Sequence, residues 1–203
     1  MQTQTHFLIS AALGQFGRRR TTLSVHMSAI LAGSVLPDIP LALLTLLYGA
    51  YYRWIAPPPQ GTDVHELLHF RLFYIDPVWI VAHNTLHSLV ITGLLALVGV
   101  LVGRRGRQWG WMLFWFALSA GFHTVLDIFT HHSDGPLLFF PLSWSYRFAS
   151  PFSYWEDAYA ADAVRLTEYV LSAVSLIYLA ITWVAARRLN AERARQPDLD
   201  QDG

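Results

Sequence analysis

Cysteine is absent from the 203-residue chain, and charged residues make up only 14% of it, against roughly a quarter in an ordinary soluble domain. Without cysteine there is no disulfide framework, and any metal site has to use histidine, aspartate or glutamate. The 14 basic side chains balance 14 acidic ones, so we expect no nucleic-acid partner. Hydrophobic residues reach 54% and histidines number nine, which favours an integral membrane protein with a polar interior.

Four apolar stretches approach the ~20 residues that a helix needs to cross a ~30 Å hydrocarbon core. They are residues 24–52, 86–103, 109–130 and 169–186. The first contains Pro37, Asp38 and Pro40, so we expect a kinked span there. Residues 6–17 are apolar but too short to cross alone. The sequence therefore predicts an all-α, polytopic membrane helical bundle with four full spans plus a short N-terminal half-helix.

Arginines are concentrated at three places, within residues 18–20, 104–107 and 187–195. With four full spans all three fall on one side of the membrane, which the positive-inside rule assigns to the cytoplasm. The connections 53–78 and 131–167 then face outward. We predict a single membrane domain over residues 1–189 and a polar, disordered cytoplasmic tail over 190–203, so that the C-terminus is cytoplasmic.

Ionisable side chains occur inside these spans, where a charge costs about 2.5–3.5 kcal/mol on the insertion scale and therefore signals function. Counting ~1.5 Å of helical rise per residue from the nearest arginine cluster places Asp38, His87 and His123 at depths of ~21–26 Å, and His6 at ~18 Å. Four separate segments thus bring a potential metal ligand to a similar depth, in the outer half of the bilayer.

Within the spans, His83 and His87 form one i,i+4 pair, and His123 and Asp127 form another, so each pair is expected to share a helix face. His131 continues the second stripe, but His123 to His131 spans ~12 Å, which is too long for the shell of one ion. Neutral imidazole and carboxylate are ligands that zinc accepts. The pattern predicts a divalent metal site, with zinc as the metal. Either the site holds two or three ions, or His131 lies outside it. The alternative is a polar network without metal.

The segment His65, Glu66 and His69 matches the HExxH pattern of zinc metalloproteases. That motif needs a helix, a third ligand and a cleft that admits a peptide. Here it lies in an outer connection and precedes FRLFYIDPVW, which is typical of an amphipathic helix on a membrane surface. A zinc metalloprotease using these three residues stays an alternative.

Residues 135–155 are dense in aromatic residues and proline around a lone arginine, Arg147. This composition predicts a lid that packs in the headgroup region. Arg147 is also a candidate clamp for a phosphate or carboxylate of a substrate above the metals.

The stretches THFLISAALG, GSVLPDIP, PVWIVAHNTLHSLV and FHTVLDIFTHHSDGPLLFFPLSW, taken in this order, resemble the YdjM-like family. Its members are described as LexA-binding, inner-membrane-associated, metal-dependent hydrolases. The resemblance covers most of residues 5–155 and implies a bacterial inner-membrane location. It implies a set of site residues at His6, Asp38, His83, His87, His123 and Asp127. PDIP and HNTLH replace the commoner PDxD and HRxxTH forms, which removes a second acid and an arginine. A more distant similarity is to zinc-dependent phospholipase C.

The resemblance implies a hydrolase, and the depth of the site favours a membrane lipid or lipid-linked substrate, above all a phosphoester. Water activated by the metal is the expected nucleophile. Asp38 is expected to act as a bridging ligand or general base. The alternatives are a non-enzymatic metal-binding or transport protein and a scaffold for a regulatory partner. The residues show no interface for a protein partner.

Overall fold

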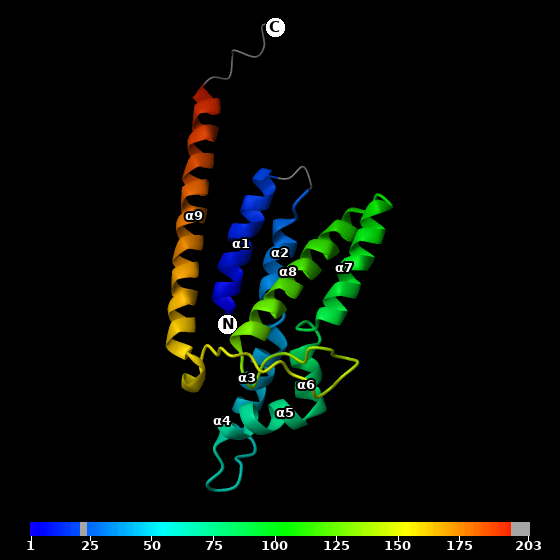
Figure 1. The fold of residues 1–203 in the computed structure, drawn as a ribbon, viewed down its shortest axis with the longest axis vertical. Coiled ribbons are helices and arrows are strands. Elements are labelled where there is room, and N and C mark those ends of the chain that lie inside the picture. The colour runs from blue at the N-terminus through cyan, green and yellow to red at the C-terminus, as the bar shows by residue number, and fades with distance from the viewer. Residues whose placement is uncertain (21–23, 196–203) are drawn as a thin grey trace.

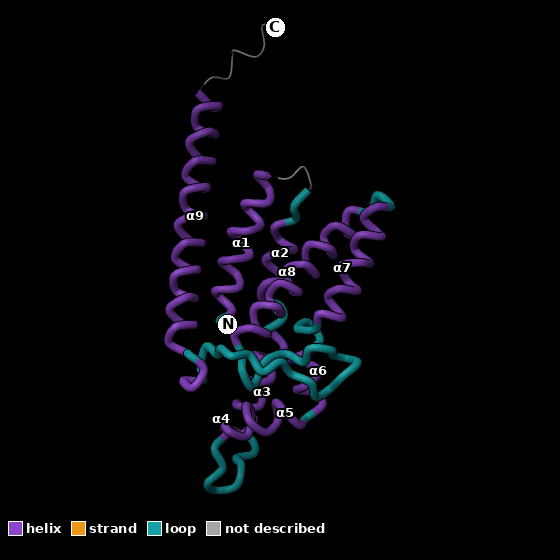
Figure 2. Tube along the Cα trace, in the orientation of Figure 1, coloured by secondary structure: helices purple, strands orange, loops and turns teal. Residues whose placement is uncertain are grey.

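The structure is a computed structural model, and it describes residues 1–20 and 24–195. These residues form helices and connecting loops without a β-strand, as predicted for an all-α chain (Figures 1 and 2). The long helices are α1 (Thr3–Arg20), α2 (Met27–Val35), α3 (Ile39–Trp54), α6 (Pro77–Asn84), α7 (Leu89–Arg104), α8 (Gln108–Thr130) and α9 (Ala161–Arg195). Shorter helical segments are α4 (Val64–Glu66), η1 (Leu67–Leu72), α5 (Phe73–Ile75) and η2 (Asp157–Tyr159).

Helices α8 and α9 are each long and apolar enough to cross a membrane. The pairs α2–α3 and α6–α7 also qualify when each is taken as one span, but they bend by 43° and 45° at short breaks. The described residues therefore contain two to four candidate membrane spans. The prolines predicted the first break, between α2 and α3. The sequence did not predict the second: it placed the start of a span at residue 86, whereas α7 begins at Leu89.

Each break has a local cause. Pro37 removes a backbone donor and Pro40 lies in the first turn of α3, so α2 ends and a helix of new direction begins. At the second break, the Ser88 side chain accepts a hydrogen bond from the Ile91 backbone N–H at 3.1 Å, which caps the start of α7. Asn84, at the end of α6, accepts from the Leu137 backbone N–H at 2.7 Å and so ties the lid segment to this break.

Helix α1 is longer than the half-helix predicted over residues 6–17, and it packs against α2 and α9. Helix α9 continues to Arg195, through the start of the predicted tail, and residues 196–203 lie outside the described residues. The arginine-bearing ends of α1, α7 and α9 lie at the same end of the bundle (Figure 1). This agrees with the predicted clustering of arginines on one side.

Helix α2 approaches α8 closely at Gly33. A Cβ atom added at Gly33 would lie 2.3 Å from the backbone oxygen of Phe116, so no larger residue fits without moving a helix. The approach brings Ser34, next to it in α2, against His123 of α8. The packing of these two helices thus sets one side of the site.

The opposite end of the bundle is closed by loops and short helices. Residues 64–75 pack on α3 through Leu68 and Phe73, which form one cluster with Trp79 of α6 and have Tyr48 and Tyr52 beside them. The lid segment from α8 to α9 crosses this end of the molecule (Figure 2). A cavity lies between these two segments and α3, and the candidate site lies on its wall.

Candidate metal centre

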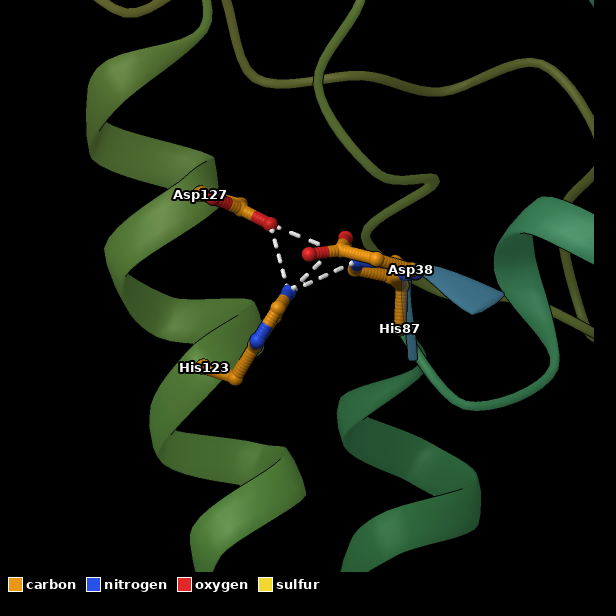
Figure 3. A group of neighbouring side chains, drawn as sticks. All are labelled: Asp38, His87, His123 and Asp127. Carbon is orange, nitrogen blue, oxygen red and sulfur yellow. Dashed lines mark hydrogen bonds and ion pairs between the residues drawn. The ribbon is translucent and has the colours of Figure 1, made fainter. Parts of the chain in front are cut away.

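Four of the predicted ligands meet in one group: Asp38, His87, His123 and Asp127 each offer an atom within 4.8 Å of the others (Figure 3). Asp38 lies in the break between α2 and α3, and His87 lies in the break before α7. His123 and Asp127 lie one turn apart on α8. Three separated segments of the chain therefore converge, and among the described residues this is the one group of three or more such ligands.

Both histidines of this group have a fixed orientation. His87 Nδ1 lies 2.7 Å from the backbone oxygen of His83, and His123 Nδ1 lies 2.9 Å from that of Ser34. A carbonyl oxygen only accepts, so each Nδ1 carries the proton and donates it. In the neutral form that binds a metal, each ring turns its Nε2 lone pair toward the group. A carbonyl acceptor behind the ring is the usual support of a histidine that binds a metal.

The distances within the group suit a tetrahedral ion. His123 Nε2 lies 3.0 Å from Asp127 Oδ2 and from His87 Nε2, and 3.3 Å from Asp38 Oδ1. His87 Nε2 lies 3.3 Å from an oxygen of each aspartate. A tetrahedral zinc with bonds of about 2.0–2.1 Å places its ligand atoms about 3.3 Å apart. A cation between the two imidazole lone pairs and the two carboxylates would be bound by all four groups. The residues present therefore fit a divalent metal.

Asp127 is held from its far side. Its Oδ1 lies 2.9 Å from His6 Nε2 and 2.9 Å from the Met1 amino nitrogen. The His6 ring also stacks on His123, with centroids 3.6 Å apart. His6 thus contacts two members of the group without joining it.

Two other predicted ligands lie outside the four. His131 follows the end of α8, and its Nδ1 lies 3.0 Å from the Asp127 backbone oxygen, outside the group of four; the spacing had left open whether it is a ligand or lies outside the site. His83 lies in α6, before the break, so it shares no continuous helix face with His87 as the i,i+4 spacing predicted. Its ring contacts the His87 and Phe73 rings, with centroids 4.6 and 4.9 Å away.

Arg147 does not take the position predicted for a phosphate clamp. Its guanidinium donates to the Gly135 backbone oxygen and lies over the rings of Phe73 and Tyr74, 5.0 and 5.3 Å from their centroids. It is absent from the cavity lining, so it holds the lid segment against residues 73–74. Burial lowers the pKa of this guanidinium.

The HExxH match does not form a metalloprotease site. His65 and His69 stand together, with ring centroids 4.5 Å apart, and both line the cavity. Glu66 is exposed and lies outside the lining. No third histidine or acid completes a ligand group with this pair within the described ranges 1–20 and 24–195. The motif therefore lacks the ligand and the base that peptide hydrolysis needs.

A cavity of about 800 Å³ opens onto the ligand group. Its wall on α3 is apolar and includes Leu41, Ala42 and Leu46. Asp38 also lines the cavity, and its side chain is 27% exposed, whereas the other three ligand side chains are exposed by at most 5%. Asp38 is thus the ligand that faces the open space.

Sequence reasoning missed several polar residues near the site. Thr3 donates its hydroxyl to Asp38 Oδ2. Glu168 of α9 is only 3% exposed and accepts from the Gln2 backbone N–H at 3.4 Å. Asp134 and Tyr154 line the cavity, and burial raises the pKa of Tyr154 to about 12, which keeps its hydroxyl protonated. Asp134 could have been noticed from its position, since this carboxylate comes three residues after His131, the last residue of the i,i+4 series that starts on α8.

Residues 1–189 match one protein family, described as YdjM inner membrane protein. No curated protein and no solved structure matches the chain.

Proposed function

The chain belongs to the YdjM inner membrane protein family, and we propose that it is a membrane-embedded, metal-dependent hydrolase of a lipid or lipid-linked phosphoester. The proposal is carried by the pair of imidazoles whose Nδ1 atoms are held by carbonyl oxygens, so that both Nε2 atoms face two carboxylates. The apolar α3 wall of the adjoining cavity supports a substrate with a hydrocarbon chain.

Asp38, His87, His123 and Asp127 would hold a single divalent ion, zinc in this proposal. When bound, such an ion would act as a Lewis acid: if its shell opens beyond the four protein ligands to admit a water, it would lower the pKa of that water and stabilise negative charge on a phosphoryl oxygen. The buried ligands His123 and Asp127 fix the site on α8. His6 positions Asp127 through its contact with Oδ1.

Asp38 is the residue that we assign to proton transfer. Of the four ligands it is the most exposed to the cavity, and Thr3 donates to its Oδ2 while its Oδ1 faces the imidazoles. In hydrolysis the water oxygen bonds to phosphorus, its proton passes to the Asp38 carboxylate, and the P–O bond to the leaving alcohol breaks. The same proton can then be given to the leaving oxygen, so Asp38 serves as base and then acid.

The proposed location is the bacterial inner membrane, with the cavity end of the bundle outside and the arginine-rich end and C-terminus in the cytoplasm. Residues 1–189 would form one membrane domain, followed by a disordered cytoplasmic tail. This orientation opens the cavity toward the outer leaflet.

The experiment is metal analysis of the purified chain, followed by hydrolysis assays on a panel of phospholipids and isoprenoid phosphates. We expect at least one equivalent of zinc or a similar metal, and phosphoester hydrolysis that a chelator abolishes and zinc restores. His123→Ala should lose both metal and activity, whereas Glu66→Gln, at an exposed position outside the cavity, should keep both. Full metal content without hydrolysis of any tested lipid would instead favour the non-enzymatic metal-binding alternative.

A further inference from the structure

The histidine pair of the HExxH match has no role in the proposed hydrolysis, yet both rings line the same cavity as the metal ligands. Residues His65 and His69 lie one helical turn apart in α4 and η1, where the segment packs onto the end of α3. Burial lowers the pKa of His69, so its ring is neutral at pH 7 and offers one N–H donor. The pair is therefore placed to contact the polar part of a molecule in the cavity.

Two further side chains that line this cavity carry buried polar atoms without a hydrogen-bond partner in the part of the chain that the structure describes. Both ring nitrogens of His83 are buried without a hydrogen-bond partner among the described residues, and the residue is only 8% exposed. The same holds for Asp134 Oδ1, while Asp134 Oδ2 accepts from the Trp155 indole N–H at 3.1 Å. Buried polar atoms in native proteins are nearly always paired, so unpaired ones that line a cavity indicate the polar atoms of a ligand.

The two kinds of group call for different partners. Imidazole N–H groups donate, and phosphate oxygens accept such bonds well. A carboxylate accepts only, and its strongest partner is a cationic N–H donor. A ligand that satisfies both carries a phosphate and, a short distance away, a protonated amine. The apolar wall formed by Leu41 and Leu46 suits a hydrocarbon chain on the same ligand, and Leu46 is 69% exposed.

We propose that His69, His83 and Asp134 form a headgroup subsite for a phospholipid with a protonated amine, of the phosphatidylethanolamine class. The imidazoles bind the phosphate, Asp134 binds the ammonium group, and the chains leave along α3. This inference rests on the proposed function for its lipid substrate, but it concerns binding and needs no turnover.

The test compares two lipids of equal charge, one whose amine carries N–H donors and one whose amine carries methyl groups. The purified full chain in detergent, treated with a chelator to prevent turnover, is titrated calorimetrically with short-chain phosphatidylethanolamine and with phosphatidylcholine of the same chains. Both lipids carry the same charges, but the methylated amine cannot donate. We expect phosphatidylethanolamine to bind about tenfold more tightly, because a charge-assisted hydrogen bond is lost in the other lipid.

Two variants separate the two halves of the subsite. Asp134→Asn keeps an acceptor for Trp155 but loses the charge, and it should reduce the preference to within about twofold. His69→Gln should weaken both lipids by the same factor and keep the preference, because the phosphate is common to both. Glu66→Gln is the matched control from the same turn and should change neither affinity. Retained phosphatidylcholine binding shows that Asp134→Asn is folded, and the retained preference for phosphatidylethanolamine shows it for His69→Gln.

Equal binding of the two lipids by the unsubstituted chain would overturn the inference, as would a preference that survives Asp134→Asn or an equal loss in Glu66→Gln. These outcomes are separate from those of the proposed function. Metal binding and hydrolysis with equal lipid affinities would reject only the headgroup assignment. An amine preference in a chain that holds no metal would reject only the hydrolase.

Discussion

The ligand assignment predicts a graded loss of metal affinity across two buried histidines that lie in contact with each other. His123 Nε2 faces both carboxylates, at 3.0 and 3.3 Å, whereas His6 Nε2 contacts only the far oxygen of Asp127. Structural zinc sites with four ligands bind with about 10–16 kcal/mol, so one ligand accounts for about 2.5–4 kcal/mol, or about 100–1000-fold in affinity. A residue that supports a ligand from behind accounts for about 10–100-fold.

The assay is zinc affinity of the purified chain by competition with a chelator of known strength. His123→Ala should weaken zinc by about 100–1000-fold and His6→Ala by about 10–100-fold. The glutamine variants sharpen the contrast. His6→Gln retains an N–H donor for Asp127 and should recover most of the affinity, whereas His123→Gln should not, since an amide is a poor replacement for an imidazole lone pair.

Equal losses in His6→Ala and His123→Ala, without rescue by His6→Gln, would make His6 a direct ligand and refute the four-residue assignment. Loss of zinc in His65→Ala would refute it as well, because His65 lies outside the group.

Three further predictions concern topology and packing. Reporters in the 104–107 loop and at the C-terminus should both be cytoplasmic and a reporter in 53–78 external, which a protease-accessibility assay checks and an external C-terminus would contradict. Gly33→Ala should lower the free energy of unfolding by about 1–3 kcal/mol and weaken zinc binding, because its Cβ would lie 2.3 Å from the Phe116 oxygen. Gly93→Ala is the control, since its Cβ would have nothing within 4 Å, and it should change neither property. Thermal melts measure the first effect and the zinc competition assay the second. Arg147→Ala should lower the melting temperature but leave KM for a phospholipid substrate unchanged, since Arg147 contacts the lid and not the cavity; a large rise in KM would restore it as a substrate clamp.

The part of the site that lies on one regular helix could be predicted from spacing alone. His123 and Asp127 are four residues apart on α8, which runs unbroken from Gln108 to Thr130, and their side chains meet at 3.0 Å. Asp38 could be located because an acid inside an apolar span is a site candidate, and its depth matches that of the histidines. The depth count was sufficient to bring these segments together because helical rise is constant.

The same reasoning failed where the helix was not regular. His83 and His87 have the spacing of a helix face, but α6 ends at Asn84, and no proline or glycine lies between the two histidines to signal it. The end is fixed instead by tertiary contacts, such as the hydrogen bond from the Leu137 N–H to Asn84, which spans 53 positions. Arg147 was misplaced for a related reason, since nothing local in the sequence indicates that aromatic rings far along the chain cover its guanidinium.

The two breaks also account for how the ligand histidines are oriented. In a continuous α-helix the Ser34 oxygen would accept from the N–H of Asp38, four residues on, but here that N–H bonds to the Val35 oxygen. The Ser34 oxygen is thereby left to accept from His123 Nδ1. Likewise the His83 oxygen, near the end of α6, accepts from the ring of His87.

A carbonyl left open within a bilayer has no water to bond to and needs a partner inside the protein. Here each such partner is an imidazole whose other nitrogen faces the acidic pair. The bends that make α2–α3 and α6–α7 poor membrane helices are thus what place and orient the ligands. A mutation that straightened either pair would return the carbonyl to its own helix and release the ring, even with all four ligand residues still present.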